Sequence, residues 1–148
     1  MLRTLFASFL AALALSAAFA EEKPKEPAKE AKKIDGSWIV ESAEMDGKDI
    51  AKTFEKTILK IDGKKYTFEI DGKEDAGSLS IDEKKTPMEM DITGGKDSPL
   101  KDKTIPCIYH WDGDNFVICY GMDFKTRPTE FKTKDGSKRM LVTYKPKK

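Results

Sequence analysis

The stretch "IDGKKYTFEIDGK", residues 61–73, decides the fold that the sequence predicts. Within it, Tyr66, Phe68 and Ile70 alternate with polar residues, and an Asp-Gly pair stands on each side. Alternation with a period of two places the apolar side chains on one face of a strand. Asp-Gly suits the type I′ turn that joins antiparallel neighbours. The stretch is therefore predicted to be a half-buried strand between two hairpin turns.

Asp-Gly pairs recur along the chain and predict a meander of short strands. Asp-Gly occurs at residues 35–36, 46–47, 62–63, 71–72, 112–113 and 135–136. Strands are predicted at residues 37–45, 56–62, 65–71, 76–82, 87–93, 103–111, 114–121 and 138–145, with one helical turn around 50–54. Eight antiparallel strands with one apolar face each bury those faces by closing into an up-and-down barrel or by stacking as a sandwich. The fold class is all-β.

The N-terminal residues predict export. Residues 1–20 carry one positive charge at Arg3, a small and apolar run, and an A-x-A site at Ala18 to Ala20, which is the layout of a signal peptide. The run is shorter than the ~20 residues that span a membrane. We therefore expect no membrane insertion after cleavage and a location in the periplasm or outside the cell.

Residues 21–33, "EEKPKEPAKEAKK", offer no apolar face and are predicted to be a solvated, disordered linker. One domain of residues 34–148 remains. Of the 27 Lys and Arg residues, Arg3 is lost with the signal peptide, which leaves 26 to balance the 26 Asp and Glu. Nucleic-acid binders carry an excess of positive charge. The balance argues against a nucleic-acid partner.

Gly36-Ser37-Trp38 matches the G-x-W with which lipocalins open their first strand. Three further stretches add to the resemblance, namely "PMEMDIT" (87–93), "IYHWDGDNFVICY" (108–120) and "RPTEF" (127–131). On these residues the chain resembles the lipocalin-like domain family of exported planctomycete proteins, over roughly residues 34–144. The resemblance implies a calycin-type barrel and export, and it implies no enzyme activity. Cys107 and Trp111 depart from the residues more usual in the family.

The resemblance also implies how one barrel end closes. In lipocalins a basic side chain from late in the chain packs across the ring of the first-strand tryptophan, here Trp38. Arg127 and Arg139 are the candidates, and Arg127 is favoured because Pro128 holds its backbone extended. In the alternative, Trp38 is simply part of the core and needs no arginine.

The two cysteines, Cys107 and Cys119, leave two arrangements open. Export and an even number of cysteines favour a disulfide. A three-residue loop at 112–114 sets the two cysteines opposite one another, whereas a two-residue turn at Asp112-Gly113 puts them on opposite faces and excludes the bond. The apolar pattern favours the two-residue turn, because that turn gathers the aromatic residues of this hairpin on one face.

The residues that carry chemistry do not assemble into a catalytic or metal motif. His110, the single histidine, is three residues from Cys107, so the two side chains are expected on opposite faces of one strand, with His110 toward water. Neither a second histidine nor a C-x-x-C pair is present to hold a metal. We therefore expect neither an enzyme nor a cofactor.

Two functions remain. In the first, the barrel binds a small apolar or amphipathic molecule, because aromatic and Met side chains suit such a pocket. The inward candidates are Trp38, Tyr66, Phe68, Met90, Tyr109, Trp111 and Phe116. In the second, these residues are core, and the filled barrel is a structural or interaction module of the cell envelope that presents loops such as 94–103 or 122–127 to a protein partner.

Export yields a first testable expectation. If residues 1–20 are a signal peptide, the mature chain begins at Glu21. N-terminal sequencing of the exported protein should read "EEKPK". A mature chain that still begins at Met1 would contradict the predicted cleavage.

Overall fold

The computed structural model describes residues 32–148. The predicted signal peptide, and the predicted linker apart from Lys32 and Lys33, lie outside the described residues. Between residues 32 and 148, no helix has the length and apolarity that a membrane crossing requires.

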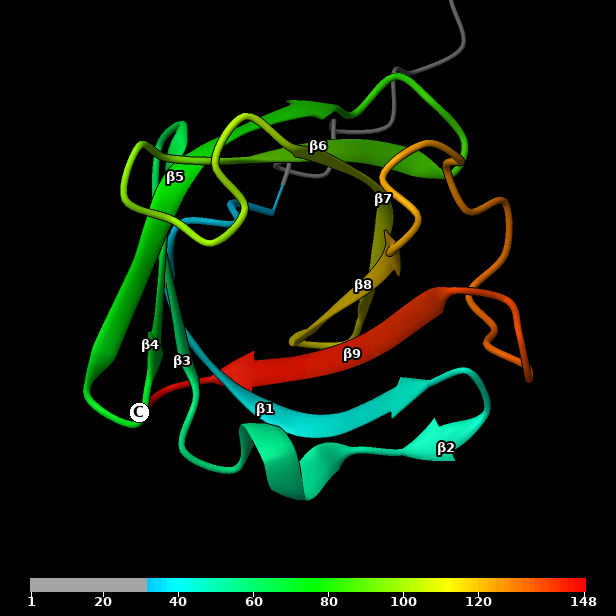
Figure 1. Ribbon diagram of the computed structural model, residues 1–148, viewed down its shortest axis with the longest axis horizontal. Coiled ribbons are helices and arrows are strands. Elements are labelled where there is room, and N and C mark those ends of the chain that lie inside the picture. The colour runs from blue at the N-terminus through cyan, green and yellow to red at the C-terminus, as the bar shows by residue number, and fades with distance from the viewer. Residues whose placement is uncertain (1–31) are drawn as a thin grey trace, which may run out of the picture. The chain divides into compact units, whose positions relative to one another are not determined.

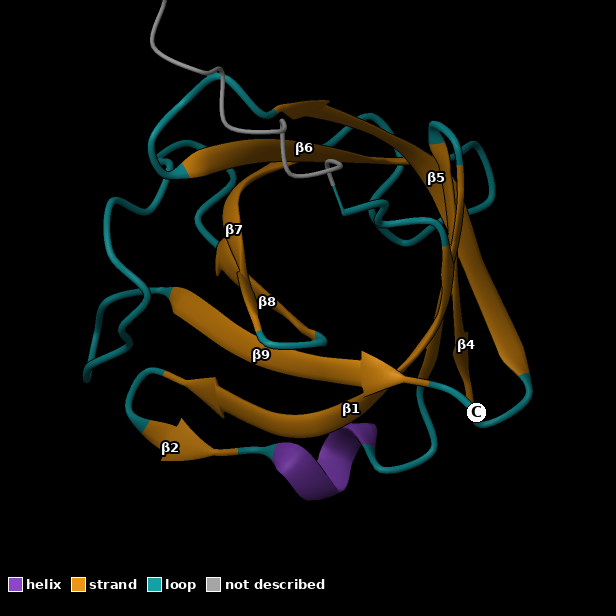
Figure 2. Cartoon of the chain, turned by 180° about the vertical axis from the view of Figure 1, so that it is seen from behind, coloured by secondary structure: helices purple, strands orange, loops and turns teal. Residues whose placement is uncertain are grey.

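Residues 33–148 form a closed antiparallel barrel. Its elements are β1 (Gly36–Met45), β2 (Lys48–Asp49), a 3-10 helix η1 (Ala51–Phe54), β3 (Ile58–Asp62), β4 (Lys65–Ile70), β5 (Lys73–Asp82), β6 (Met88–Gly94), β7 (Thr104–Asp112), β8 (Asn115–Gly121) and β9 (Arg139–Pro146). Each main strand pairs with the next, and β9 pairs with β1 to close the barrel, while the short β2 pairs antiparallel with the end of β1 (Figures 1 and 2). The all-β, eight-stranded, up-and-down barrel is confirmed, and the sandwich is excluded.

The predicted strands agree with the observed ones because their signals are local. Every predicted boundary lies within three residues of the observed one. In the β4–β5 turn, Asp71 and Gly72 both have positive φ, 48° and 79°, as the type I′ turn requires. The predicted helical turn is also present, as η1.

A bulge in β1 keeps its apolar side chains inside the barrel. The register of β1 against β9 shifts between Val40 and Ser42, so that Glu41 is the extra residue. Trp38, before the bulge, and Ala43, after it, are both buried although their numbers differ in parity. Without the extra residue, the second half of β1 would turn its apolar side chains to water.

The β7–β8 hairpin corrects one detail of the predicted register. Asp112 pairs with Asn115, so the two turn residues are Gly113 and Asp114 rather than Asp112 and Gly113. The shift is two residues in pairing, which preserves the faces. Cys107 pairs with Tyr120, whereas Cys119 pairs with Ile108, so the two thiols lie on opposite faces of the sheet and are free.

Residues 122–138, which we call the outer segment, cover the outer face of β7 and β8. Ile108 and Cys119 face outward yet are almost completely buried. The ring of Phe131 packs edge-on against His110 with centroids 4.3 Å apart. His110 lies on the outer face, opposite Cys107, as expected, but the outer segment half-buries it, so the expectation of a fully solvated ring is wrong.

Arg127 fastens the outer segment to the barrel. Its Nη1 donates to the carbonyl oxygens of Cys107 at 2.8 Å and Met90 at 3.1 Å, and its Nη2 donates to Asp91 Oδ1 at 2.7 Å. Its Nε lies 3.5 Å from Glu89 Oε1. The guanidinium therefore lies against β6 and β7.

The expectation that Arg127 packs across Trp38 is wrong. The outer segment runs along the outside of the wall, so its guanidinium meets the carbonyl oxygens and carboxylates there, whereas the Trp38 ring contacts Trp111 and Phe116 inside. Arg139 does not replace it. It lies seven residues along β9 from Pro146, the pairing partner of Trp38, a separation of about 23 Å along a strand.

Loss of the Arg127 contacts should loosen the outer segment. Hydrogen bonds to charged groups contribute ~1.5–3 kcal/mol, and partial exposure of Arg127 and Asp91 reduces that value. We expect Arg127→Ala to lower the free energy of unfolding by about 1–3 kcal/mol, measured by urea denaturation. Lys125→Ala, an exposed change in the same segment, is the control; equal effects of the two would contradict the role of Arg127.

Candidate functional site

One end of the barrel is filled by an aromatic cluster. Trp38 lies 5.7 Å from Trp111 and 5.4 Å from Phe116, measured between ring centroids, and Tyr109 lies 5.6 Å from Phe116. Trp38 Nε1 donates to the carbonyl oxygen of Ile34 at 2.9 Å, which ties the chain before β1 to this end. Four of the seven predicted inward residues thus come together as packed side chains.

The middle of the barrel is also filled. Met90, Cys107 and Ile118 are at most 1% exposed. The hydroxyl groups of Tyr120 and Tyr144 hydrogen-bond each other at 2.7 Å across the interior. Because these side chains are closely packed and the two hydroxyl groups bond each other, this layer leaves little room for a ligand.

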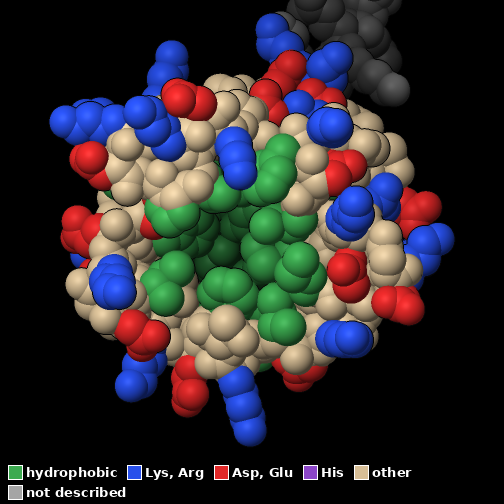
Figure 3. All heavy atoms as spheres, viewed as in Figure 1, with side chains coloured by type: hydrophobic (Ala, Val, Ile, Leu, Met, Phe, Trp, Pro, Cys, Tyr) green, Lys and Arg blue, Asp and Glu red, His purple; other side chains and the backbone are tan. Residues whose placement is uncertain are grey.

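The opposite end is open. Figure 3, viewed as in Figure 1, shows a hollow lined by hydrophobic side chains at the end where η1, the 95–103 loop and the start of the outer segment lie. We call this hollow the barrel mouth. Half-buried apolar residues pack against the core from the elements that frame it, namely Ile50, Phe54, Phe68, Leu100, Met122, Phe124 and Met140.

Two of the predicted residues, Tyr66 and Phe68, lie on the inner face of β4 toward this mouth. Their rings meet edge-on with centroids 5.5 Å apart. Tyr66 is 2% exposed, whereas Phe68 is half-buried and takes part in the apolar lining. Phe68 is thus the predicted residue best placed to touch a bound molecule.

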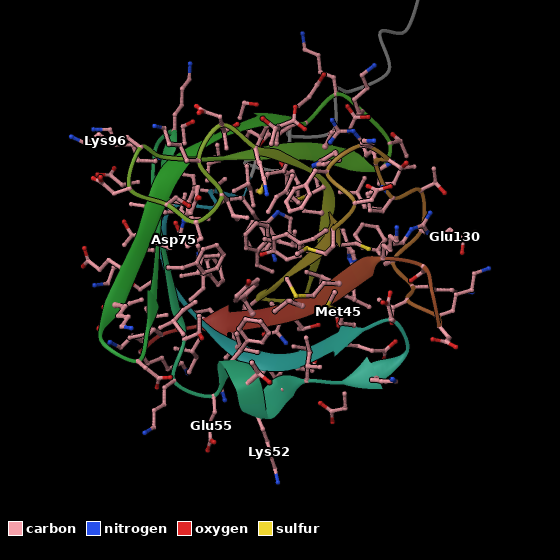
Figure 4. The ribbon with its side chains drawn as sticks, in the orientation of Figure 1. Met45, Lys52, Glu55, Asp75, Lys96 and Glu130 are labelled. Atoms are coloured by element: carbon pink, nitrogen blue, oxygen red, sulfur yellow. The ribbon has the colours of Figure 1, made fainter. Side chains whose placement is uncertain are left out.

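A carboxylate faces the same interior. Asp75 on β5 pairs with Phe68, and Gly77 pairs with Tyr66, so Asp75 shares the inward face of these aromatic residues. Figure 4 places Asp75 on β5, whereas the labelled Lys52, on η1, and Lys96, on the 95–103 loop, point away from the opening.

Several buried polar atoms lack partners. They are Asp75 Oδ1 and the hydroxyl oxygens of Tyr66, Tyr109 and Thr57. Burial, reinforced by the charge of Asp75, raises the pKa of Tyr66 to about 12. The nearby Ser98 hydroxyl acts to lower that pKa, yet it does not meet the geometry of a hydrogen bond to Tyr66.

Asp75 was missed by the prediction from sequence. The strand was expected to begin at residue 76, but β5 begins at Lys73. The available signal is the period of two, since Asp75 is in phase with Gly77 and Leu79. Asp75 is polar and stands at the edge of a weak alternating pattern, so it was assigned to the preceding turn and not to the inward face of a strand.

No protein-family model, no curated protein and no solved structure matches the chain. The barrel is consistent with a calycin or lipocalin-like fold, in which strands pair in chain order and the last closes on the first. Within residues 32–148, no three His, Cys, Asp or Glu side chains gather as they would around a metal ion.

The tyrosines provide a test of the filled interior. All four tyrosines of the chain are buried. Burial raises the pKa of Tyr66 and of Tyr109 to about 12, and burial also raises the pKa of Tyr120 and of Tyr144. The folded state therefore favours the neutral phenols, and this stabilisation is complete below ~10, the pKa of an unfolded tyrosine, and is lost as the pH rises above it.

We expect no tyrosinate absorbance from the folded barrel near pH ~10. The phenols should ionise together in one cooperative step at higher pH, coincident with loss of the near-ultraviolet circular dichroism. The urea-unfolded chain, which should titrate near pH ~10, is the control. Gradual ionisation near that pH while the protein stays folded would contradict a filled, dry interior.

Proposed function

We propose that this chain is an exported, non-enzymatic binding protein that takes a small apolar or amphipathic molecule into the barrel mouth. The proposal includes membership of the lipocalin-like family of exported planctomycete proteins, for which the support is the resemblance in sequence. It includes no nucleic-acid partner and no cofactor. The observation that carries it is the hollow lined by apolar side chains at one barrel end (Figure 3).

The physical argument starts from the cost of exposed apolar surface. A gathered apolar patch on a protein surface commonly marks a binding site, because covering it releases water from it. Here the patch is concave, as small-molecule sites usually are, and η1, two loops and the ends of strands frame it (Figure 3). Since the middle of the barrel is filled, the ligand must be small or must leave part of its length in solvent.

The filled end and middle of the barrel also favour a second candidate function. Tyr109, Tyr120, Phe116 and Met90 are all at most 2% exposed, as in an ordinary core. On this alternative, the barrel is a structural or interaction module of the cell envelope and carries no ligand. The two functions differ in one measurable property, saturable uptake of an apolar molecule.

A neutral apolar fluorophore, N-phenylnaphthylamine, tests the proposal. We expect a saturable, one-to-one rise of its fluorescence with the folded protein. Phe68→Ser should weaken binding about three- to tenfold, because it removes an apolar contact worth roughly 1 kcal/mol. The dissociation constant from the fluorescence titration is the measurement.

Phe131→Ser is the matched control, because Phe131 is also a half-buried phenylalanine but packs on the outer face against His110. It should leave the dissociation constant unchanged. Absence of saturable binding to the unchanged protein would favour the filled module, as would equal losses in both variants. Circular dichroism of each variant establishes that it is folded.

A further inference from the structure

Asp75 places one carboxylate oxygen where it has no partner. Its Oδ1 atom is completely shielded from solvent and accepts no hydrogen bond. It takes part in none of the ion pairs formed among residues 32–148. Burying a carboxylate oxygen without a donor is costly, and buried polar atoms are normally satisfied. The unfilled acceptor therefore indicates a missing donor.

A second unpartnered group lies beside it. Tyr66 is only 2% exposed, and its hydroxyl oxygen is buried without a hydrogen bond. Gly77 pairs with Tyr66, and Asp75 pairs with Phe68. Tyr66 and Asp75 are therefore diagonal neighbours on the inward face of β4 and β5. In keeping with this, burial raises the pKa of Tyr66 and the charge of Asp75 adds to the rise. Two strands, β4 and β5, thus aim an acceptor and a phenol at the same part of the interior.

Gly77 makes this arrangement possible. A Cβ atom at Gly77 would lie 2.8 Å from Tyr66 Cε1 and 2.1 Å from the carbonyl oxygen of Thr93. Only a residue without a side chain lets the Tyr66 ring lie directly on β5, next to the strand position of Asp75. The backbone of this region is therefore shaped around the tyrosine.

The chemistry of the two groups selects the ligand. A carboxylate accepts hydrogen bonds and carries a negative charge, so its best partner is a cationic N–H donor. A primary ammonium group supplies three donors and the matching charge. A lysine at the rim, Lys103, does not supply this donor. Its Nζ lies over the Phe124 ring, 5.2 Å from the ring centroid, and it forms no ion pair with Asp75.

We propose that the barrel mouth binds an amphipathic amine, whose ammonium group donates to Asp75 and Tyr66 while its apolar part lies against the half-buried lining. This inference rests on the proposed function, since it names the class of ligand that the same hollow takes. An alkylamine satisfies both the unfilled acceptor and the apolar surface at once.

Three probes with the same chain and different heads test it: octylammonium, 1-octanol and octanoate, titrated at neutral pH by isothermal calorimetry. We expect octylammonium to bind at least tenfold more tightly than octanol, as a charge-assisted hydrogen bond provides. Octanoate should bind most weakly. Octanol should compete with octylammonium, which would show that both occupy the same site. Its affinity should then measure the contribution of the apolar lining alone.

Variants locate the head group. Asp75→Asn, which keeps the shape and removes the charge, should weaken octylammonium about tenfold or more and change octanol less than about twofold. Tyr66→Phe should weaken octylammonium severalfold. Glu74→Gln is the matched control, because Glu74 precedes Asp75 on β5 and is exposed on the opposite face. It should leave all three affinities unchanged.

The outcomes separate this inference from the proposed function. Equal binding of all three probes, or no effect of Asp75→Asn, would overturn the amine site while leaving an apolar carrier. Tightest binding of octanoate would also overturn it, in favour of the rim lysine. Binding of none of the probes would overturn both. The comparison of ammonium with alcohol uses the unchanged protein, so it decides the matter even if a variant does not fold.

Discussion

Closure of β1 on β9 is the constraint on which the rest of this structure depends. The pairing runs from Trp38 opposite Pro146 to Met45 opposite Met140. It removes the two exposed edges that an open sheet of this size would present to other chains. It also turns one apolar face of each main strand toward one enclosed space. The bulge at Glu41 makes this pairing compatible with burial along the whole of β1, because it switches the inward positions from even to odd numbers.

The enclosed space has three layers with different properties. Aromatic rings around Trp38 occupy one end, tyrosines and small apolar groups occupy the middle, and the third layer is the open mouth. Packed side chains in the first two layers leave the apolar hollow of the third layer as the place where the interior opens to solvent (Figure 3). The polar atoms of Asp75 and Tyr66 in this layer would then set which head group is accepted.

The barrel could be predicted because its strands and turns have local sequence signals, whereas features that depend on long-range contacts could not. Asp-Gly pairs and the period of two are read within ten residues, so the strands and their order follow from them. The path of residues 122–138 has no period, and only long-range contacts decide that it lies outside the barrel with Arg127 on β6 and β7. The expectation that Arg127 packs over Trp38 came from the lipocalin resemblance, and no local signal in these residues could correct it. Among the site residues, Tyr66 and Phe68 followed from alternation, whereas Asp75 required knowing that β5 starts at Lys73.

The opposite orientation of the two thiols has a consequence for the covalent structure of the chain. Cys107 faces the interior and Cys119 lies beneath the outer segment, so the sheet itself stands between them. Burial raises the pKa of Cys119 to about 11 and that of Cys107 well above its ordinary value, which keeps both sulfurs as unreactive thiols. The native fold of residues 32–148 therefore contains no disulfide, and the two sulfurs cannot be joined without moving the backbone of β7 or β8.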